Sequence, residues 1–158
     1  MKLSDEFTLR QASNSDSGEI KKLVFGILEE YGLKSDTSST DKDLDDIEYY
    51  YTNNDGYFAV ITNAENLIIA STGLFKINKT TCELRKMYLS KRFRGKGLGR
   101  FLLEFSLDKA KELGYSQVVL ETASVLKEAI GLYKSYGFSE ETGGHLSSRC
   151  DQRYFLKL

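Results

Sequence analysis

The chain has 158 residues, of which 41% are hydrophobic and 28% charged, and its formal net charge is −1. These values are typical of a single globular domain, expected here over residues 1–158, that buries a sizeable core without cross-links. Two cysteines are too few for a disulfide scaffold, and no apolar run approaches the roughly 18 residues of a membrane span. The near-neutral net charge excludes a protein that binds nucleic acid with its whole surface.

The N-terminal residues show no targeting signal. Asp5 and Glu6 lie within the first ten residues, which contain no apolar stretch of the signal-peptide type. We therefore expect a cytoplasmic protein with reduced thiols and no membrane contact. A short first strand is predicted over residues 7–10.

A first helix follows this strand. Asp16 with Glu19 three residues later fits a capping box, and Gly32 fits the end of the helix. One face of the helix carries apolar residues at helical spacing, namely Ile20, Leu23, Val24, Ile27, Leu28 and Tyr31.

A second, weaker helix is predicted from about residue 41 to residue 51. Thr40 would be its cap. The residues expected to face the core are Leu44, Ile47 and Tyr51.

After residue 51, the spacing of apolar residues changes from that of a helix to that of strands. Residues 57–61 are aromatic and β-branched, residues 67–77 form a longer apolar run, and residues 83–89 form a fourth strand. Gly73 interrupts the second of these segments, which indicates a bulge or bend there.

The last third of the chain alternates helices and strands. A helix is predicted over residues 97–113, a buried strand over 117–120, a helix over 125–136 and a closing strand over 154–158. This order of elements predicts an α/β protein built around one sheet.

The loop at residues 91–100 carries the clearest chemical signal. It lies between a strand and a helix, and it contains three glycines, Gly95, Gly97 and Gly99, among basic residues. Glycine allows close approach of a ligand to the backbone, and the free N–H groups at a helix start attract anions. The loop is therefore predicted to bind a phosphate or pyrophosphate.

Four other interpretations apply to a glycine-rich basic loop of this kind. A P-loop is excluded because no Ser or Thr follows a Gly-Lys pair, and a dinucleotide fingerprint fails because Arg100 stands where its third glycine belongs. A basic turn with glycines for tight packing stays open at this point, as does a contact with nucleic acid, although the neutral-to-acidic remainder of the chain disfavours the latter.

Two motifs together resemble a known family. Arg94, Gly97 and Gly99 fit the pattern Arg/Gln-x-x-Gly-x-Gly/Ala between a strand and a helix, and residues 129–138 fit Ala-x-x-Leu-Tyr-x-x-x-Gly-Phe. With the preceding strand at residues 83–89, they resemble the GNAT superfamily of N-acetyltransferases. The order of elements agrees over nearly the whole chain.

This resemblance implies a mixed, mostly antiparallel sheet of about six or seven strands flanked by about four helices. Its fourth and fifth strands would part and admit the pantetheine arm of acetyl-CoA, which would pair with the backbone of Met87, Tyr88 and Leu89. Many members carry Asn where this chain has Leu126, which removes a polar contact to that arm. The pyrophosphate would be held by Arg94, Gly95, Lys96, Gly97, Leu98, Gly99 and Arg100.

The resemblance also implies catalytic roles. Acetyl transfer needs a donor for the carbonyl oxygen, expected in the backbone near Met87, and a proton for the departing thiolate. Tyr133 occupies the family's position for the acid, although its apolar helix face also fits a core aromatic. Glu83 resembles the family's general base, although it also fits a strand glutamate paired with Arg85. Glu121 is the reserve candidate for the base.

The implied acceptor is a primary amine, acetylated directly in a ternary complex because no nucleophile for a covalent intermediate stands out. Residues 36–48 contain six acidic residues and one lysine. In the family this region borders the acceptor site, so its charge would attract a cationic amine. A solvated helix face is the other interpretation.

Several further expectations concern partners. No metal is expected, because His145 is the only histidine and no metal-type cluster surrounds it. The sequence leaves a homodimer open. A non-catalytic module that binds acyl-CoA or a partner on the same fold is the alternative to an enzyme.

Overall fold

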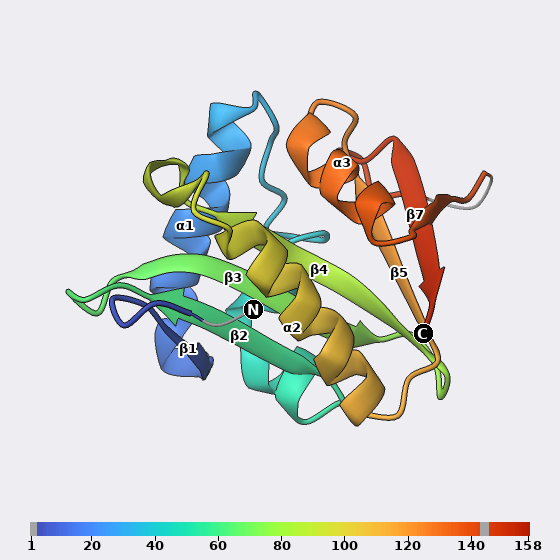
Figure 1. Ribbon diagram of the computed structural model, residues 1–158, viewed down its shortest axis with the longest axis horizontal. Helices are drawn as coiled ribbons and strands as arrows, with labels where there is room; N and C mark the ends of the chain where they lie inside the picture. The colour runs from blue at the N-terminus through green and yellow to red at the C-terminus, as the bar shows by residue number, and fades with distance from the viewer. Residues whose placement is uncertain (1–2, 143–145) are drawn as a thin grey trace.

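The structure is a computed structural model that describes residues 3–142 and 146–158. A single sheet runs through it in the order β1-β2-β3-β4-β5-β7-β6 (Figure 1). Its strands pair antiparallel except for the parallel pair β4–β5. The strands are β1 (Thr8–Gln11), β2 (Tyr57–Thr62), β3 (Ile68–Lys76), β4 (Thr81–Leu89), β5 (Gln117–Thr122), β6 (Ser139–Glu140) and β7 (Gln152–Lys157).

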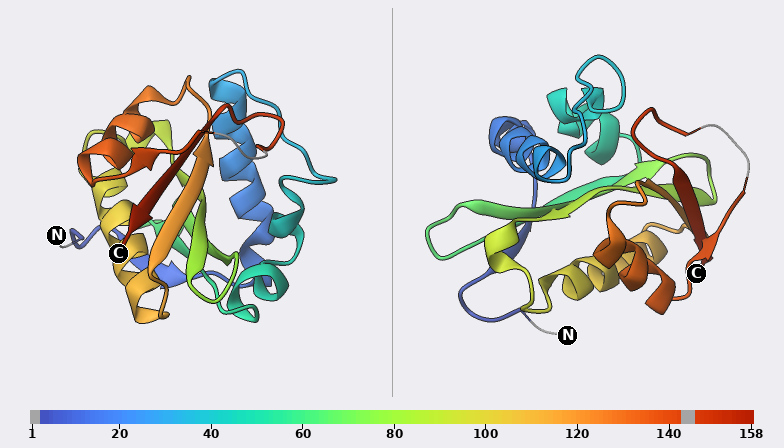
Figure 2. Two further views of the ribbon diagram at one scale, coloured as in Figure 1. Left: turned by 90° about the vertical axis from the view of Figure 1, so that its right-hand side faces the viewer. Right: turned by 90° about the horizontal axis from the view of Figure 1, so that it is seen from above.

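Helices cover both faces of the sheet, as predicted. Figure 2 shows α1 with η2 and η3 on one face and α2 with α3 on the other. Each face has its own apolar core, one beneath α1 and one beneath α2 and α3. The helical segments are η1 (Asn14–Asp16), α1 (Ser17–Glu30), η2 (Lys42–Asp45), η3 (Glu48–Thr52), η4 (Lys91–Phe93), α2 (Leu98–Glu112) and α3 (Lys127–Ser135).

The start of α1 differs in detail from the prediction. The Asp16 carboxylate accepts the backbone N–H of Ser13 at 2.9 Å and pairs with Arg10 at 2.8 Å, so the reciprocal cap lies one turn before the predicted Asp16–Glu19 box. Arg10 is in β1, and its pairing with Asp16 ties the helix start to the sheet. The predicted stop is confirmed, because Gly32 has the left-handed φ of +70° that ends a helix.

The predicted regular helix over residues 41–51 is wrong. The segment instead forms the 3₁₀ turn η2 and the π-helical turn η3. In an α-helix, residues two apart point to different sides, but the side chains of Asp41 and Asp43 both turn toward Lys86. Thr40 does not cap the segment; its carbonyl accepts a hydrogen bond from the Lys86 ammonium at 3.1 Å. The three apolar residues predicted to face inward are fully buried, namely Leu44, Ile47 and Tyr51.

The expected irregularity at Gly73 is confirmed. The register between β3 and β4 shifts between Ser71 and Gly73. A Cβ at Gly73 would lie 2.9 Å from ring atoms of Phe58 and Tyr51, so only glycine fits. On the facing strand, Lys86 has a left-handed φ of +55°. This bulge redirects β4 before it reaches residues 87–89.

The strands β4 and β5 pair only at their beginnings. Thr81–Glu83 pair with Gln117–Val119. Beyond these residues, β4 continues to Leu89 and β5 to Thr122 without further pairing between them. The expected parting of the fourth and fifth strands is therefore present, and it leaves an opening within the sheet.

Candidate active site

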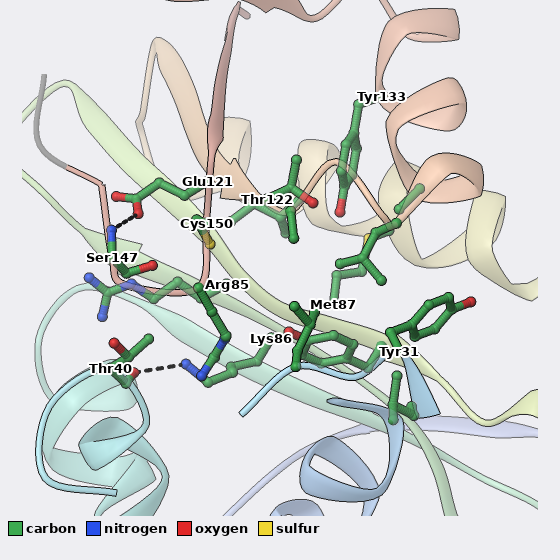
Figure 3. Close-up of a pocket in the computed structure, with 18 of the residues that line it drawn as sticks. Tyr31, Thr40, Arg85, Lys86, Met87, Glu121, Thr122, Tyr133, Ser147 and Cys150 are labelled. Carbon is green, nitrogen blue, oxygen red and sulfur yellow. Dashed lines mark hydrogen bonds between the residues drawn. The ribbon is translucent and has the colours of Figure 1, made fainter. Parts of the chain in front are cut away.

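A cavity of about 810 Å³ occupies the opening between β4 and β5. Its walls come from β4, the loop before α2, the end of β5 and one face of α3. The segments at residues 31–40 and 146–150 complete its lining, with Tyr31 at one end and Thr40, Ser147 and Cys150 toward the other (Figure 3). Elements far apart in the chain thus converge on one long cavity.

The glycine loop lies at one end of this cavity. Gly95 and Gly97 have left-handed φ angles of +80° and +83°, which turn the chain into α2. Within the described chain, the backbone N–H groups of residues 95–100 donate no hydrogen bond, and Phe101 is the first to donate, to the Gly97 carbonyl at 3.0 Å. Free amides and a helix dipole are features that favour phosphate binding, which remains a prediction for this loop.

The side chain of Arg94 is held by hydrogen bonds to neighbouring elements. Its guanidinium donates two hydrogen bonds to the Glu30 carboxylate, at 2.6 and 3.1 Å. It also donates to the Tyr31 hydroxyl at 3.1 Å and to the Leu89 carbonyl at 3.0 Å. The side chain of Arg94 therefore fixes the loop against α1 and the end of β4.

The residues predicted to bind the cofactor do not all line the same cavity. Those that line it are Met87, Tyr88, Leu89, Arg94, Gly95 and Gly99. Lys96, Gly97 and Leu98 line a separate cavity of about 270 Å³ beside residues 3–7. Arg100 is exposed, with its guanidinium 5.6 Å from the centre of the Tyr136 ring.

Tyr133 belongs to the core by its ring and to the cavity by its hydroxyl. The side chain is 6% exposed, and its ring centre lies 5.7 Å from that of Phe138. Figure 3 shows the hydroxyl pointing from α3 into the pocket, and it has no hydrogen-bond partner in the described part of the chain. Burial raises the pKa of Tyr133 strongly, and the phenol therefore stays protonated at neutral pH.

Four carboxylate residues line the cavity, namely Asp36, Glu83, Glu121 and Glu128, and two of them are the candidates for the base. Glu83, 7% exposed, accepts a hydrogen bond from Arg85 with one oxygen, and its Oε2 atom accepts none from the described residues. Glu121 accepts the N–H of Ser147 at 2.8 Å through Oε1, and its Oε2 lies 3.9 Å from Arg153 (Figure 3). The pairing of Glu83 with Arg85 was one of the two interpretations of the sequence.

A buried network of charges lies beneath the other end of the cavity. The Lys86 ammonium is within 3.4 Å of Asp41 and 3.2 Å of Asp43. Arg149 binds both oxygens of Asp41 at 2.7 Å, and the Tyr51 hydroxyl donates to Asp43. Burial opposes ionisation of Asp41, but hydrogen bonds from Arg149 and a backbone amide, with the nearby cations, outweigh it and lower its pKa.

This network corrects the expectation for two of the six acidic residues at positions 36–48, whereas Asp36 lines the cavity and Asp45 is exposed. Asp41 and Asp43 form neither an acidic rim nor a solvated face, because both are buried and paired. Sequence reasoning missed Lys86 and Arg149 as their partners. The available signal was weak: Lys86 follows a run of strand residues at a position where a bulge, invisible in the pattern, turns its side chain inward.

The described residues contain neither a metal-ligand cluster nor a helix suited to a membrane. No group of three or more His, Cys, Asp or Glu side chains there could hold a metal ion. His145, which entered the expectation of no metal, lies outside the described residues. None of the helices in residues 3–142 and 146–158 combines the length and the apolarity that a membrane span requires.

The comparison with known proteins agrees with this geometry. Residues 24–138 match the acetyltransferase (GNAT) family. The uncharacterized N-acetyltransferase YjgM of Escherichia coli is 32% identical over 135 residues, which cover 82% of this chain and 80% of that protein. These matches define a protein of the acyltransferase class. The chain belongs to the GNAT family of acetyltransferases, which confirms the resemblance seen in the sequence.

Solved structures show the same fold. A GNAT-family acetyltransferase from Staphylococcus aureus Mu50 superposes with a TM-score of 0.89 at 23% identity, covering 96% of this chain and 98% of the other. The protein yncA from Salmonella typhimurium, solved with its cofactor acetyl-CoA, has a TM-score of 0.76 at 20% identity, with 97% and 94% covered. The predicted fold class is confirmed, with seven strands in the sheet.

Proposed function

We propose that this protein transfers the acetyl group of acetyl-CoA to a primary amine by direct attack in a ternary complex. The proposal rests on one observation, which is that the free amides of the glycine loop and the Tyr133 hydroxyl lie in the same cavity. Free backbone amides lie at one end, and the unpartnered hydroxyl of Tyr133 points into the same space. Membership of the family and the acetyl-CoA complex of a structural neighbour support the same cosubstrate.

The cofactor would lie along the opening between β4 and β5. Its diphosphate would accept hydrogen bonds from the amides of residues 95–100. Its pantetheine arm would pair with the unpaired backbone edge of β4 at Met87, Tyr88 and Leu89, as an added strand does. The side chains of Lys96 and Arg100 lie outside this cavity, so we assign their contribution to the backbone amides.

The chemistry follows from the polarity of this site. The nitrogen lone pair of a neutral amine attacks the thioester carbon, and a backbone N–H near Met87 would stabilise the charge on the carbonyl oxygen. The C–S bond then breaks, and the electron pair leaves on sulfur as thiolate. The Tyr133 hydroxyl would donate a hydrogen bond, and finally its proton, to this sulfur. Its raised pKa makes full proton transfer uphill, so the hydrogen bond itself provides much of the stabilisation.

The amine must also lose a proton, and we assign the base role to Glu83. Its Oε2 atom is free of hydrogen bonds from the described residues, whereas both oxygens of Glu121 face partners. A free carboxylate oxygen in a partly buried cavity can accept the proton directly or through water. The comparison of Glu83→Gln with Glu121→Gln tests the assignment, since the larger loss of kcat/KM identifies the base.

The test of the proposed function is a free-thiol release assay with acetyl-CoA and a panel of primary amines. Release that depends on the amine supports the proposal, and initial-velocity lines that intersect support a ternary complex. Parallel lines would indicate a covalent intermediate instead. Tight binding of acetyl-CoA with no release by any amine would make the protein a binding module.

A further inference from the structure

Arg85 carries donor groups that nothing in the described chain uses. Its Nε atom donates to Glu83, but neither terminal nitrogen donates a hydrogen bond to a described residue. The guanidinium carbon lies 3.7 Å from the centre of the Phe75 ring, and the side chain is 30% exposed. Stacking and the Nε hydrogen bond thus hold a planar cation in one orientation within the cavity.

The other cations that line this part of the cavity are already paired. Lys86 and Arg149 are bound by buried carboxylates. Glu121 accepts a backbone amide and faces Arg153, whereas the half-buried Asp36 lines the cavity and accepts the hydroxyls of Ser38 and Thr40. The terminal nitrogens of Arg85 are therefore the donors left for an anion on the ligand. Figure 3 shows Arg85 in the part of the pocket bordered by Thr40 and Cys150.

The unused donors of Arg85 and the unused acceptor of Glu83 are neighbours. Arg85 and Glu83 are joined by the Nε hydrogen bond, so the unused terminal nitrogens lie beside the unused Oε2 atom. A ligand that satisfies both groups carries an anion and an amine only a few bonds apart. A guanidinium offers two parallel N–H groups, which match the two oxygens of a carboxylate.

We propose that the acceptor is an amino acid, with its carboxylate bound by the terminal nitrogens of Arg85 and its amine facing Glu83. This inference rests on the proposed function and names its substrate class. It differs from the expectation of a cationic acceptor, because a second positive group placed beside Arg85 would be repelled by its guanidinium. Arg85 is on this account a specificity-determining residue.

The experiment compares each of the common L-amino acids with its amide in the thiol-release assay. The amide keeps the amine and lacks the carboxylate, and 1,4-diaminobutane serves as the dication. We expect the best amino acid to exceed its amide at least about tenfold in kcat/KM, mainly through KM. Arg85→Gln should bring this ratio close to one, and Arg85→Lys should keep part of it. The control is Lys79→Gln, which removes an exposed charge in the turn before β4 and should leave the ratio unchanged.

The ratio is measured within each variant, so partial unfolding of a variant does not alter it. Amides or the diamine as the best wild-type substrates, or an unchanged ratio in Arg85→Gln, would overturn the inference. A separate binding measurement distinguishes it from the proposed function. If no amine releases thiol, but an amino acid raises the Tm of the CoA-bound wild type and not of Arg85→Gln, the ligand class stands and the enzymatic proposal fails. If no amino acid is either acetylated or bound, the inference fails as well.

Discussion

Arg149 and Asp41 form a two-bond ion pair, with both N–O distances at 2.7 Å, although 108 residues separate them in the chain. Asp41 lies in the segment after α1 and Arg149 in the segment before β7. Both segments are walls of the cavity, so this pair ties together two walls that the sheet itself does not connect. Lys86, beneath the pair, ties the same carboxylate to β4.

Asp41→Asn should therefore destabilise the protein markedly. It removes the charge that compensates Arg149 and Lys86, both largely buried, and such a loss costs about 3–5 kcal/mol. Urea unfolding at pH 7 measures it. Asp45→Asn is the control, because its ion pair with Lys21 is on the surface and is worth at most about 1 kcal/mol. Equal losses in the two variants would contradict the role of the buried pair.

The same carboxylate should make the fold sensitive to acid. The pKa of Asp41 is lower in the folded protein than in the unfolded chain, where it is about 3.9. Its stabilisation is therefore present above about pH 3.9 and is lost as the pH falls through the folded-state pKa. Unfolding free energies at pH 5, 4 and 3 should fall less steeply in Asp41→Asn than in the wild type. Parallel curves would show that Asp41 does not contribute to acid unfolding.

Tyr133→Phe should lower turnover about 10²-fold or more if the hydroxyl serves the departing sulfur. The affinity for acetyl-CoA should change little. The hydroxyl has no partner in the described chain, so its removal breaks no internal hydrogen bond and the Tm should remain close to that of the wild type. Steady-state kinetics and calorimetric titration measure these effects, with Tyr49→Phe on the exposed surface as the control. Turnover within twofold of the wild type would remove the acid role.

The glycine loop is best tested at Gly99. A substitution at Gly97 strains the backbone, because its φ is +83°, so lost binding there would be ambiguous. A Cβ at Gly99 meets only Leu132, at an ordinary 3.8 Å, so Gly99→Val should fold while it crowds the free amides. We expect the affinity for acetyl-CoA to fall by at least about tenfold in calorimetric titration.

The matched control for this substitution is Gly26→Val. Gly26 is also a helical glycine, in α1, and nothing lies within 4 Å of an added Cβ there. It should bind acetyl-CoA as the wild type does. Unchanged affinity in Gly99→Val, or an equal loss in both variants, would count against the loop as the phosphate site.

Leu126→Asn should restore the polar contact that many relatives of this family make. Leu126 lines the cavity and precedes α3, and no side-chain cap closes the start of that helix. An amide there should tighten acetyl-CoA binding severalfold and stabilise α3 by about 0.5–1 kcal/mol. Leu126→Ala separates the gain of the amide from the loss of the leucine. Weaker binding in Leu126→Asn than in Leu126→Ala would refute the contact.

The parts of the fold that repeat a local pattern were predictable from the sequence. Helical spacing located α1 and α2, apolar runs located the central strands, and Gly73 marked the bulge. The segment at residues 41–51 was not predictable, because its apolar spacing suits a helix while its carboxylates turn toward a lysine more than 40 residues away. Long-range charge pairing of this kind leaves no period in the sequence.

The candidate site was predicted in the same uneven way. The motifs located the glycine loop, and they located Tyr133, whose hydroxyl lies in the cavity. They did not reveal that the side chain of Arg94 is bound by Glu30, since that contact depends on where α1 ends relative to β4. Nor did they reveal the free face of Arg85, which depends on its stacking over Phe75 on the neighbouring strand.

The early parting of β4 and β5 has a consequence for colloidal behaviour. Unpaired strand edges usually sit at the outside of a sheet, where they recruit strands of other molecules and promote aggregation. Here the two unpaired edges face one another within the sheet, enclosed by α3 and by the two loops that the ion pair of Asp41 and Arg149 joins. A narrow, extended ligand fits this gap between the two strands, whereas the sheet of a neighbouring protein does not. The molecule thereby keeps a vacant strand position at β4 and β5 without exposing these edges to aggregation.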